Sequence, residues 1–91
     1  MDLTNYKMLK IHYRKQFLKD LKKIKDKILR ERIVKKTLEF EKQDKLLGKK
    51  LENVPYWSIR VGNYRLIFEK TGNEIDFYRI LARKFKYREL R

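Results

Sequence analysis

The residues best suited to chemistry are two arginines on either side of a short loop. Arg60 and Arg65 flank Gly62-Asn63 within an aromatic and β-branched run. A guanidinium stays protonated at neutral pH and grips phosphate oxygens with a planar fork, so such a pair suits binding of phosphate better than proton transfer. The whole chain has 26 Lys and Arg against 12 Asp and Glu, a net charge of +14. We therefore expect a polyanionic partner, with nucleic acid first.

The sequence lacks the residues that several other kinds of catalytic site require. Cys is absent and His12 is the one histidine, which leaves no thiol nucleophile and no zinc site of the usual ligands. We expect neither a metal nor a cofactor, and we interpret His12 as a residue on the face of a strand.

A two-residue loop at Gly62-Asn63 predicts a tight hairpin. The resulting register sets Arg60 opposite Arg65, with both side chains facing away from the core. The core side then carries Trp57, Ile59, Val61, Tyr64, Leu66 and Phe68.

Like charges directly opposite each other destabilise a sheet by a few tenths to ~1 kcal/mol. The pairing of Arg60 with Arg65 therefore indicates an anion-binding role. The alternative is that both side chains splay into water or pair with Glu69 and Asp76.

The elements that must position this hairpin follow from the rest of the pattern. Residues 8–13 read as a short strand, and helical spacing then places Phe17, Leu21, Ile24 and Ile28 on one face. A turn within 24–27 separates this helix from a second, whose stripe is Leu29, Ile33 and Phe40. Gly48 leads into an extended segment, and a second turn at 71–73 precedes a strand over 74–81.

These elements predict one α+β domain over residues 1–91. An N-terminal strand and two antiparallel helices pack on one face of an antiparallel sheet, which ends in a three-strand meander. No apolar run approaches ~18 residues, and Met1 to Asn5 lack the apolar core of a signal peptide. We therefore expect a cytoplasmic protein without a membrane partner, monomeric on its own.

The second half of the chain resembles the RelE/ParE toxin superfamily. The family's hairpin, R-I-R-x-G-x-Y-R, is matched by Ile59-Arg60-Val61-Gly62-Asn63-Tyr64-Arg65, and its strand end, R-I-x-x-R-K, by Arg79-Ile80 and Arg83-Lys84. The resemblance is looser in the helical half. It implies a RelE-like fold, an acidic antitoxin as partner, and cleavage of messenger RNA on the ribosome by attack of the RNA's own 2′-hydroxyl.

The resemblance also implies roles for particular residues. Arg65, Arg60 and Arg83 would stabilise the reacting phosphate and its leaving oxygen, and Tyr87 would hold a base. The RNA backbone would contact four lysines, Lys49, Lys50, Lys84 and Lys86.

Two positions depart from the family pattern. Ser58 replaces a basic residue of many relatives, and Ala82 replaces a histidine of several, so two candidates for proton transfer are missing. Two alternatives therefore stay open beside the endoribonuclease: a ParE-like inhibitor of DNA gyrase, and a catalytically degenerate RNA-binding member.

Overall fold

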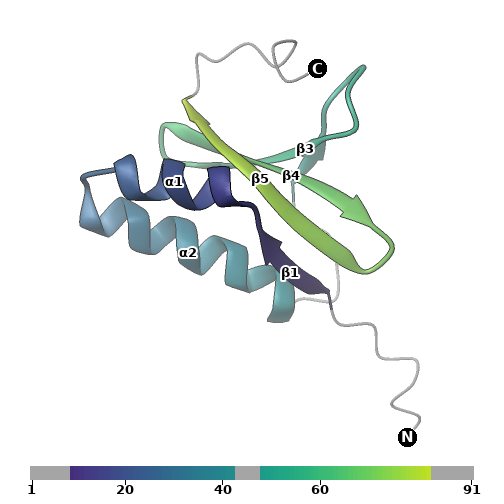
Figure 1. Ribbon diagram of the computed structural model, residues 1–91, viewed down its shortest axis with the longest axis horizontal. Helices are drawn as coiled ribbons and strands as arrows, with labels where there is room; N and C mark the ends of the chain where they lie inside the picture. Colours follow the sequence, from purple (N-terminus) through teal and green to yellow (C-terminus); the bar gives the residue numbers. More distant parts are fainter. Residues whose placement is uncertain (1–8, 43–47, 83–91) are drawn as a thin grey trace, which may run out of the picture.

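The computed structural model describes residues 9–42 and 48–82, which form two helices on one side of a five-stranded sheet (Figure 1). The sheet order is β1-β5-β4-β3-β2. This arrangement confirms the α+β class. The elements are β1 Lys10–Tyr13, α1 Lys15–Lys23, α2 Lys27–Lys42, β2 Lys49–Lys50, β3 Trp57–Val61, β4 Tyr64–Thr71 and β5 Glu74–Ala82.

The break between the helices is held by side chains and not by Gly or Pro. Asp26 Oδ1 accepts the backbone N–H of Leu29 at 3.1 Å, which is the contact of a helix N-cap. Arg30 Nη1 donates to the carbonyl of Ile24 at 2.6 Å. Because α2 begins at Lys27, Ile28 lies in its first turn and is 71% exposed. Its predicted place on the buried stripe of α1 is wrong.

The β3–β4 hairpin has the predicted register. Arg60 lies opposite Arg65, and Val61 opposite Tyr64. Gly62 takes φ 58° whereas Asn63 does not have a positive φ, the pattern of a type II′ turn. A two-residue loop of this type follows the twist of the strands and so fixes which side chains share a face.

The sheet is mixed, not wholly antiparallel. β3, β4 and β5 form the expected antiparallel meander, whereas β1 pairs with β5 in parallel, with Lys10 opposite Glu74. Direct turns set the direction of the meander strands. No such turn joins β1 to β5, because both helices and the other strands lie between them in the chain. The direction of β1 relative to β5 therefore depends on how the helices pack on the sheet.

A bulge in β5 shifts by one residue the alternation of its side chains between the two faces of the sheet. Phe68 pairs with Phe77 while Ile67 pairs with Arg79, so Tyr78 is an extra residue. Phe77 and Ile80 both belong to the core under the helices. Tyr78 instead stacks on Tyr56, with ring centroids 5.1 Å apart.

Two apolar clusters lie on opposite faces of the sheet. The larger one joins Phe17, Ile33 and Phe40 of the helices to Leu66, Phe68 and Phe77 of the sheet, all of them buried. The smaller one gathers Val54, Tyr56, Ile67 and Leu81. It covers part of the helix-free face, the face that also carries Arg60 and Arg65 of the hairpin. Neither described helix has the length and apolarity needed to cross a bilayer.

Candidate functional site

A groove of about 310 Å³ lies on the helix-free face beside the β3–β4 hairpin. Arg60, Arg65 and Lys49 supply its cations. Lys49 lies opposite Ser58 in the β2–β3 ladder, so it shares a face with Arg60, two residues further along β3. Three of the residues singled out from the sequence therefore meet in one place. We call it the hairpin groove; Gly48, Ser58 and Ile59 complete its lining.

Gly48 lets the chain come close enough to β3 to form this groove. Its φ is +97°, and a Cβ at this position would lie 2.6 Å from the carbonyl oxygen of Ser58 and 3.3 Å from the ring of Phe68. A side chain here would collide with β3 in a backbone conformation that L-residues rarely adopt. The sequence marked Gly48 as a transition point but gave no sign of this close approach.

Of the other predicted site residues, the structure describes Lys50 alone, and Lys50 does not line the groove. Lys50 lies opposite Trp57, whose side chain packs against the core under the helices, so the ladder places Lys50 on the other face from Lys49. Arg83, Lys84, Lys86 and Tyr87 lie outside the described residues.

Asp76, one of the two carboxylates considered as partners for the arginine pair, is engaged elsewhere in the sheet. Asp76 accepts the Nε–H of Arg14 at 2.7 Å, across the β5 end of the sheet from the hairpin groove. Within residues 9–42 and 48–82 no carboxylate pairs with Arg60, which is exposed. The same residues contain no group of three or more His, Asp or Glu side chains placed to hold a metal ion.

Comparison with known proteins gives the family. Residues 11–87 match the family model described as ParE toxin of type II toxin-antitoxin system, parDE. The chain is also 38% identical over 85 residues to Toxin RelE3 of Methanocaldococcus jannaschii, a match that spans 87% of this chain and 96% of that protein. The chain belongs to the RelE/ParE toxin family.

Solved structures of other family members have the same fold. A chain of the RelB-RelE antitoxin-toxin complex from Methanococcus jannaschii aligns with a TM-score of 0.70 at 35% identity, covering 80% of this chain and 91% of that one. A chain of the toxin-antitoxin complex RelBE2 from Mycobacterium tuberculosis aligns with a TM-score of 0.69 at 18% identity, covering 84% of this chain and 99% of that one. The second likeness shows the fold alone.

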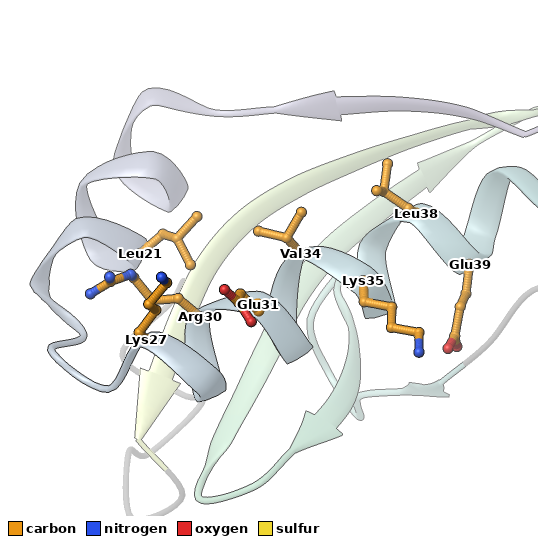
Figure 2. Close-up of a pocket in the computed structure, with 8 residues that line it drawn as sticks. All are labelled: Leu21, Lys27, Arg30, Glu31, Val34, Lys35, Leu38 and Glu39. Atoms are coloured by element: carbon orange, nitrogen blue, oxygen red, sulfur yellow. The ribbon is translucent and has the colours of Figure 1, made fainter.

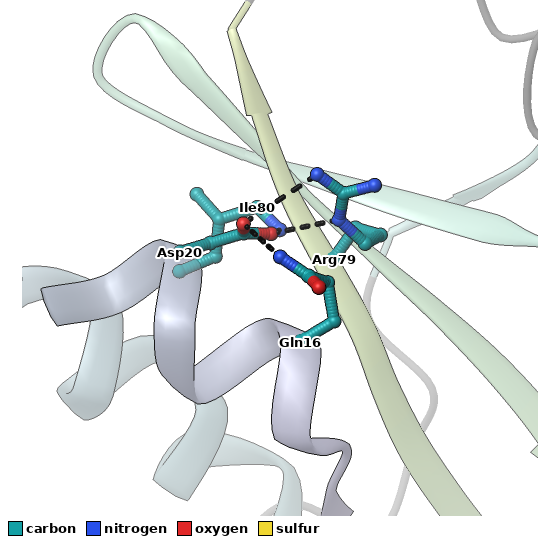
Figure 3. Close-up of polar contacts among 4 residues, drawn as sticks. All are labelled: Gln16, Asp20, Arg79 and Ile80. Atoms are coloured by element: carbon teal, nitrogen blue, oxygen red, sulfur yellow. Dashed lines mark hydrogen bonds and ion pairs between the residues drawn. The ribbon is translucent and has the colours of Figure 1, made fainter. Parts of the chain in front are cut away.

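One cation of the family motif is not available to the groove. Arg79 donates its Nε–H to Oδ2 of Asp20 at 2.9 Å, and its Nη2 approaches Oδ1 at 3.5 Å (Figure 3). Asp20 also accepts the backbone N–H of Ile80 at 3.0 Å and the amide of Gln16 at 3.1 Å. This carboxylate joins α1 to β5. The pairing of β1 with β5 ends at Phe77, so the N–H of Ile80 has no partner in β1 and donates to Asp20 instead.

The electrostatics of Asp20 favour the ionised form in spite of burial. Removal from water is the largest influence and raises the pKa, but the hydrogen bonds from Arg79, Ile80 and Gln16 and the positive charge of Arg79 together outweigh it. The net result is a pKa below the usual value for an aspartate. In this family member Arg79 is therefore a structural cation. The sequence left its direction open, because the β5 bulge that turns it has no motif of its own.

Proposed function

We propose that this toxin inhibits translation as an endoribonuclease that cuts messenger RNA on the ribosome. The observation that carries the proposal is the cross-strand pair of Arg60 and Arg65 lining the hairpin groove with Lys49. Opposed guanidiniums cost stability in a sheet unless an anion lies between them. The match to Toxin RelE3 supports the same assignment.

In the proposed reaction the 2′-oxygen attacks the adjacent phosphorus and the bond from phosphorus to the 5′-oxygen breaks. The 2′-hydroxyl proton leaves to a base, and the 5′-oxygen gains a proton as it departs. The products are a 2′,3′-cyclic phosphate and a 5′-hydroxyl end. Arg60 and Arg65 stabilise the extra negative charge of the phosphorane, the kind of stabilisation that dominates many such reactions.

The remaining residues of the family pattern complete the proposal. Arg83 acts on the leaving side, Tyr87 holds a base, and the RNA backbone contacts Lys49, Lys50, Lys84 and Lys86. Of the lysines in this set that the structure describes, Lys49 lines the hairpin groove. At rest, an acidic antitoxin covers the arginines and relieves part of the +14 charge.

The test is controlled expression followed by mapping of transcript ends. Expression of the wild type should arrest growth and yield transcripts cut within codons, with 5′-hydroxyl ends. Arg65→Ala should reduce cutting on the order of 10²-fold, the usual cost of removing one group that stabilises a developing oxyanion. Lys70→Ala removes an exposed cation of the same strand away from the groove and is the control. Uncut transcripts during growth arrest would rule the proposal out.

The second candidate is a ParE-like inhibitor that binds DNA gyrase without cutting RNA. The match to the ParE family model favours it, as do Ser58 and Ala82, the two departures from the family pattern noted in the sequence. It predicts a DNA-damage response with intact transcripts. The same expression experiment therefore separates the two candidates.

A further inference from the structure

A second hollow continues from the hairpin groove onto helix α2. It measures about 300 Å³ and is lined by Arg32, Lys35, Lys36 and Glu39 of α2 with Arg60 and Val61 of β3. Arg60 lines this hollow and the hairpin groove alike. The two hollows are therefore neighbours on either side of one arginine. We call the second one the helix hollow.

The orientation of α2 fixes these cations in place. Ile33, Thr37 and Phe40 are fully buried and set the rotation of the helix against the sheet. Positions 32, 35, 36 and 39 follow the spacing of three and four residues that defines one face of a helix. They line the flank of α2 beside β3, which α2 contacts.

The charge of the helix hollow is strongly one-sided. Four cationic side chains and one carboxylate line it. The carboxylate, Glu39, is already engaged by Lys36 at 3.1 Å. Within residues 9–42 and 48–82, no carboxylate pairs with Arg32, Lys35 or Arg60. Cationic side chains on a helix usually just face water. The cations of the helix hollow differ because they lie next to the candidate site, with Arg60 lining both hollows.

We propose that the helix hollow is a second phosphate-binding subsite, so that an RNA strand runs from the hairpin groove past Arg60 onto α2. For its ligand class this inference rests on the proposed function. It adds Arg32 and Lys35 as RNA-binding residues outside the groove where the reaction would occur.

The lining of the helix hollow favours RNA over an acidic peptide. Docking of an amphipathic helix needs several apolar anchors. The helix hollow offers one apolar residue, Val61, which is buried. A different groove of about 520 Å³, on the outer side of the helices, has Leu21, Val34 and Leu38 in its lining. Lys35 and Glu39 also line this groove, but in Figure 2 the side chains of Val34 and Leu38 point in a different direction from α2 than those of Lys35 and Glu39. A peptide partner would find its anchors there, whereas the helix hollow offers mainly charge.

The test measures binding of single-stranded RNA with every 2′-hydroxyl methylated, which keeps the phosphates but prevents the proposed cleavage. A dodecanucleotide should reach both hollows, and a trinucleotide only one. Arg32→Gln should weaken dodecanucleotide binding about fivefold at ~0.1 M salt and lower the salt slope by about 0.7, as loss of one phosphate contact predicts. Glu39→Gln should strengthen binding, because it removes the one carboxylate and releases Lys36.

The matched control is Lys22→Gln, which removes the same charge from an exposed position of α1 that lines neither hollow. Equal losses for Arg32→Gln and Lys22→Gln would overturn the inference, as would a wild type that binds neither oligonucleotide. So would an Arg32→Gln variant that loses affinity for an antitoxin but not for RNA. If the wild type binds through Arg32 yet leaves transcripts uncut, the second subsite stands and the proposed endoribonuclease does not. If transcripts are cut and Arg32→Gln does not change RNA binding, the proposed endoribonuclease stands and the second subsite does not.

Discussion

Arg79 of β5 donates its Nε–H to Oδ2 of Asp20 on α1 across 2.9 Å, and the same carboxylate oxygen accepts the backbone N–H of Ile80 at 3.0 Å. The buried Asp20 side chain thus accepts hydrogen bonds both from an arginine and from a backbone N–H at the edge of β5. The contact joins the first helix to the last strand of the sheet, and so joins two parts of the chain that local sequence signals do not connect.

Replacement of Asp20 should therefore lower stability. Asp20→Asn keeps the shape but loses the charge that attracts Arg79, and it offers one acceptor oxygen where the carboxylate has two. We expect a loss of about 1–3 kcal/mol in the free energy of unfolding, within the range for hydrogen bonds to charged groups. Gln16→Ala removes a single contact to Asp20 and should cost about 1 kcal/mol or less. Urea denaturation checks both values, and equal effects of the two variants would contradict this ranking.

The pH dependence of stability should follow from the same carboxylate. Its pKa is lower in the folded state than the ~3.9 of an unfolded aspartate, so the folded state holds fewer protons in the acid range. The resulting stabilisation is complete well above ~3.9 and is lost as the pH falls through the lower, folded pKa. The stability gap between wild type and Asp20→Asn should therefore be widest near neutrality and shrink in acid. Chemical denaturation as a function of pH measures it, and a gap that does not narrow would contradict this role for Asp20.

Gly48 should be more sensitive to substitution than Gly72, although both have positive φ. Gly48→Ala brings a Cβ to within 2.6 Å of the Ser58 carbonyl oxygen, whereas a Cβ at Gly72 meets nothing within 4 Å. We expect Gly72→Ala to cost about 1–2 kcal/mol for the left-handed backbone alone, and Gly48→Ala clearly more. Thermal unfolding ranks the two variants. Since Lys49 follows Gly48 into the hairpin groove, RNA binding should fall in Gly48→Ala but not in Gly72→Ala.

Local signals in the sequence were enough to predict the hairpin that carries the arginines. The two-residue loop at Gly62-Asn63 fixes the strand register, and the register fixes the faces, so the opposition of Arg60 and Arg65 follows directly. Part of the helix break was also visible in principle. Asp26 is a standard N-cap residue, and it would have placed Ile28 outside the buried stripe of α1.

Long-range contacts could not be predicted in this way. The parallel pairing of β1 with β5 depends on how the helices pack on the sheet. The bulge at Tyr78 leaves only a subtle trace, an apolar spacing that changes from two residues between Ile75 and Phe77 to three between Phe77 and Ile80. Because the sequence does not reveal the bulge, it predicts neither the direction of the Arg79 side chain nor its pairing with Asp20.

The opposition of Arg60 and Arg65 should make stability and activity change in opposite directions. Arg60→Thr removes one of two like charges facing each other across the ladder and introduces a residue that favours strands. Its free energy of unfolding should rise by a few tenths to ~1 kcal/mol. RNA cleavage should fall on the order of 10²-fold, because a group that stabilises the phosphorane is lost.

Lys70→Thr is the matched control, since it makes the same chemical change at an exposed strand position that lines neither the hairpin groove nor the helix hollow. It should leave cleavage unchanged. Denaturation and transcript-end mapping on the same preparations measure the two effects together. An Arg60→Thr variant that loses both stability and cleavage would show that Arg60 supports the fold, and would remove the main physical reason for placing a phosphate between the two arginines.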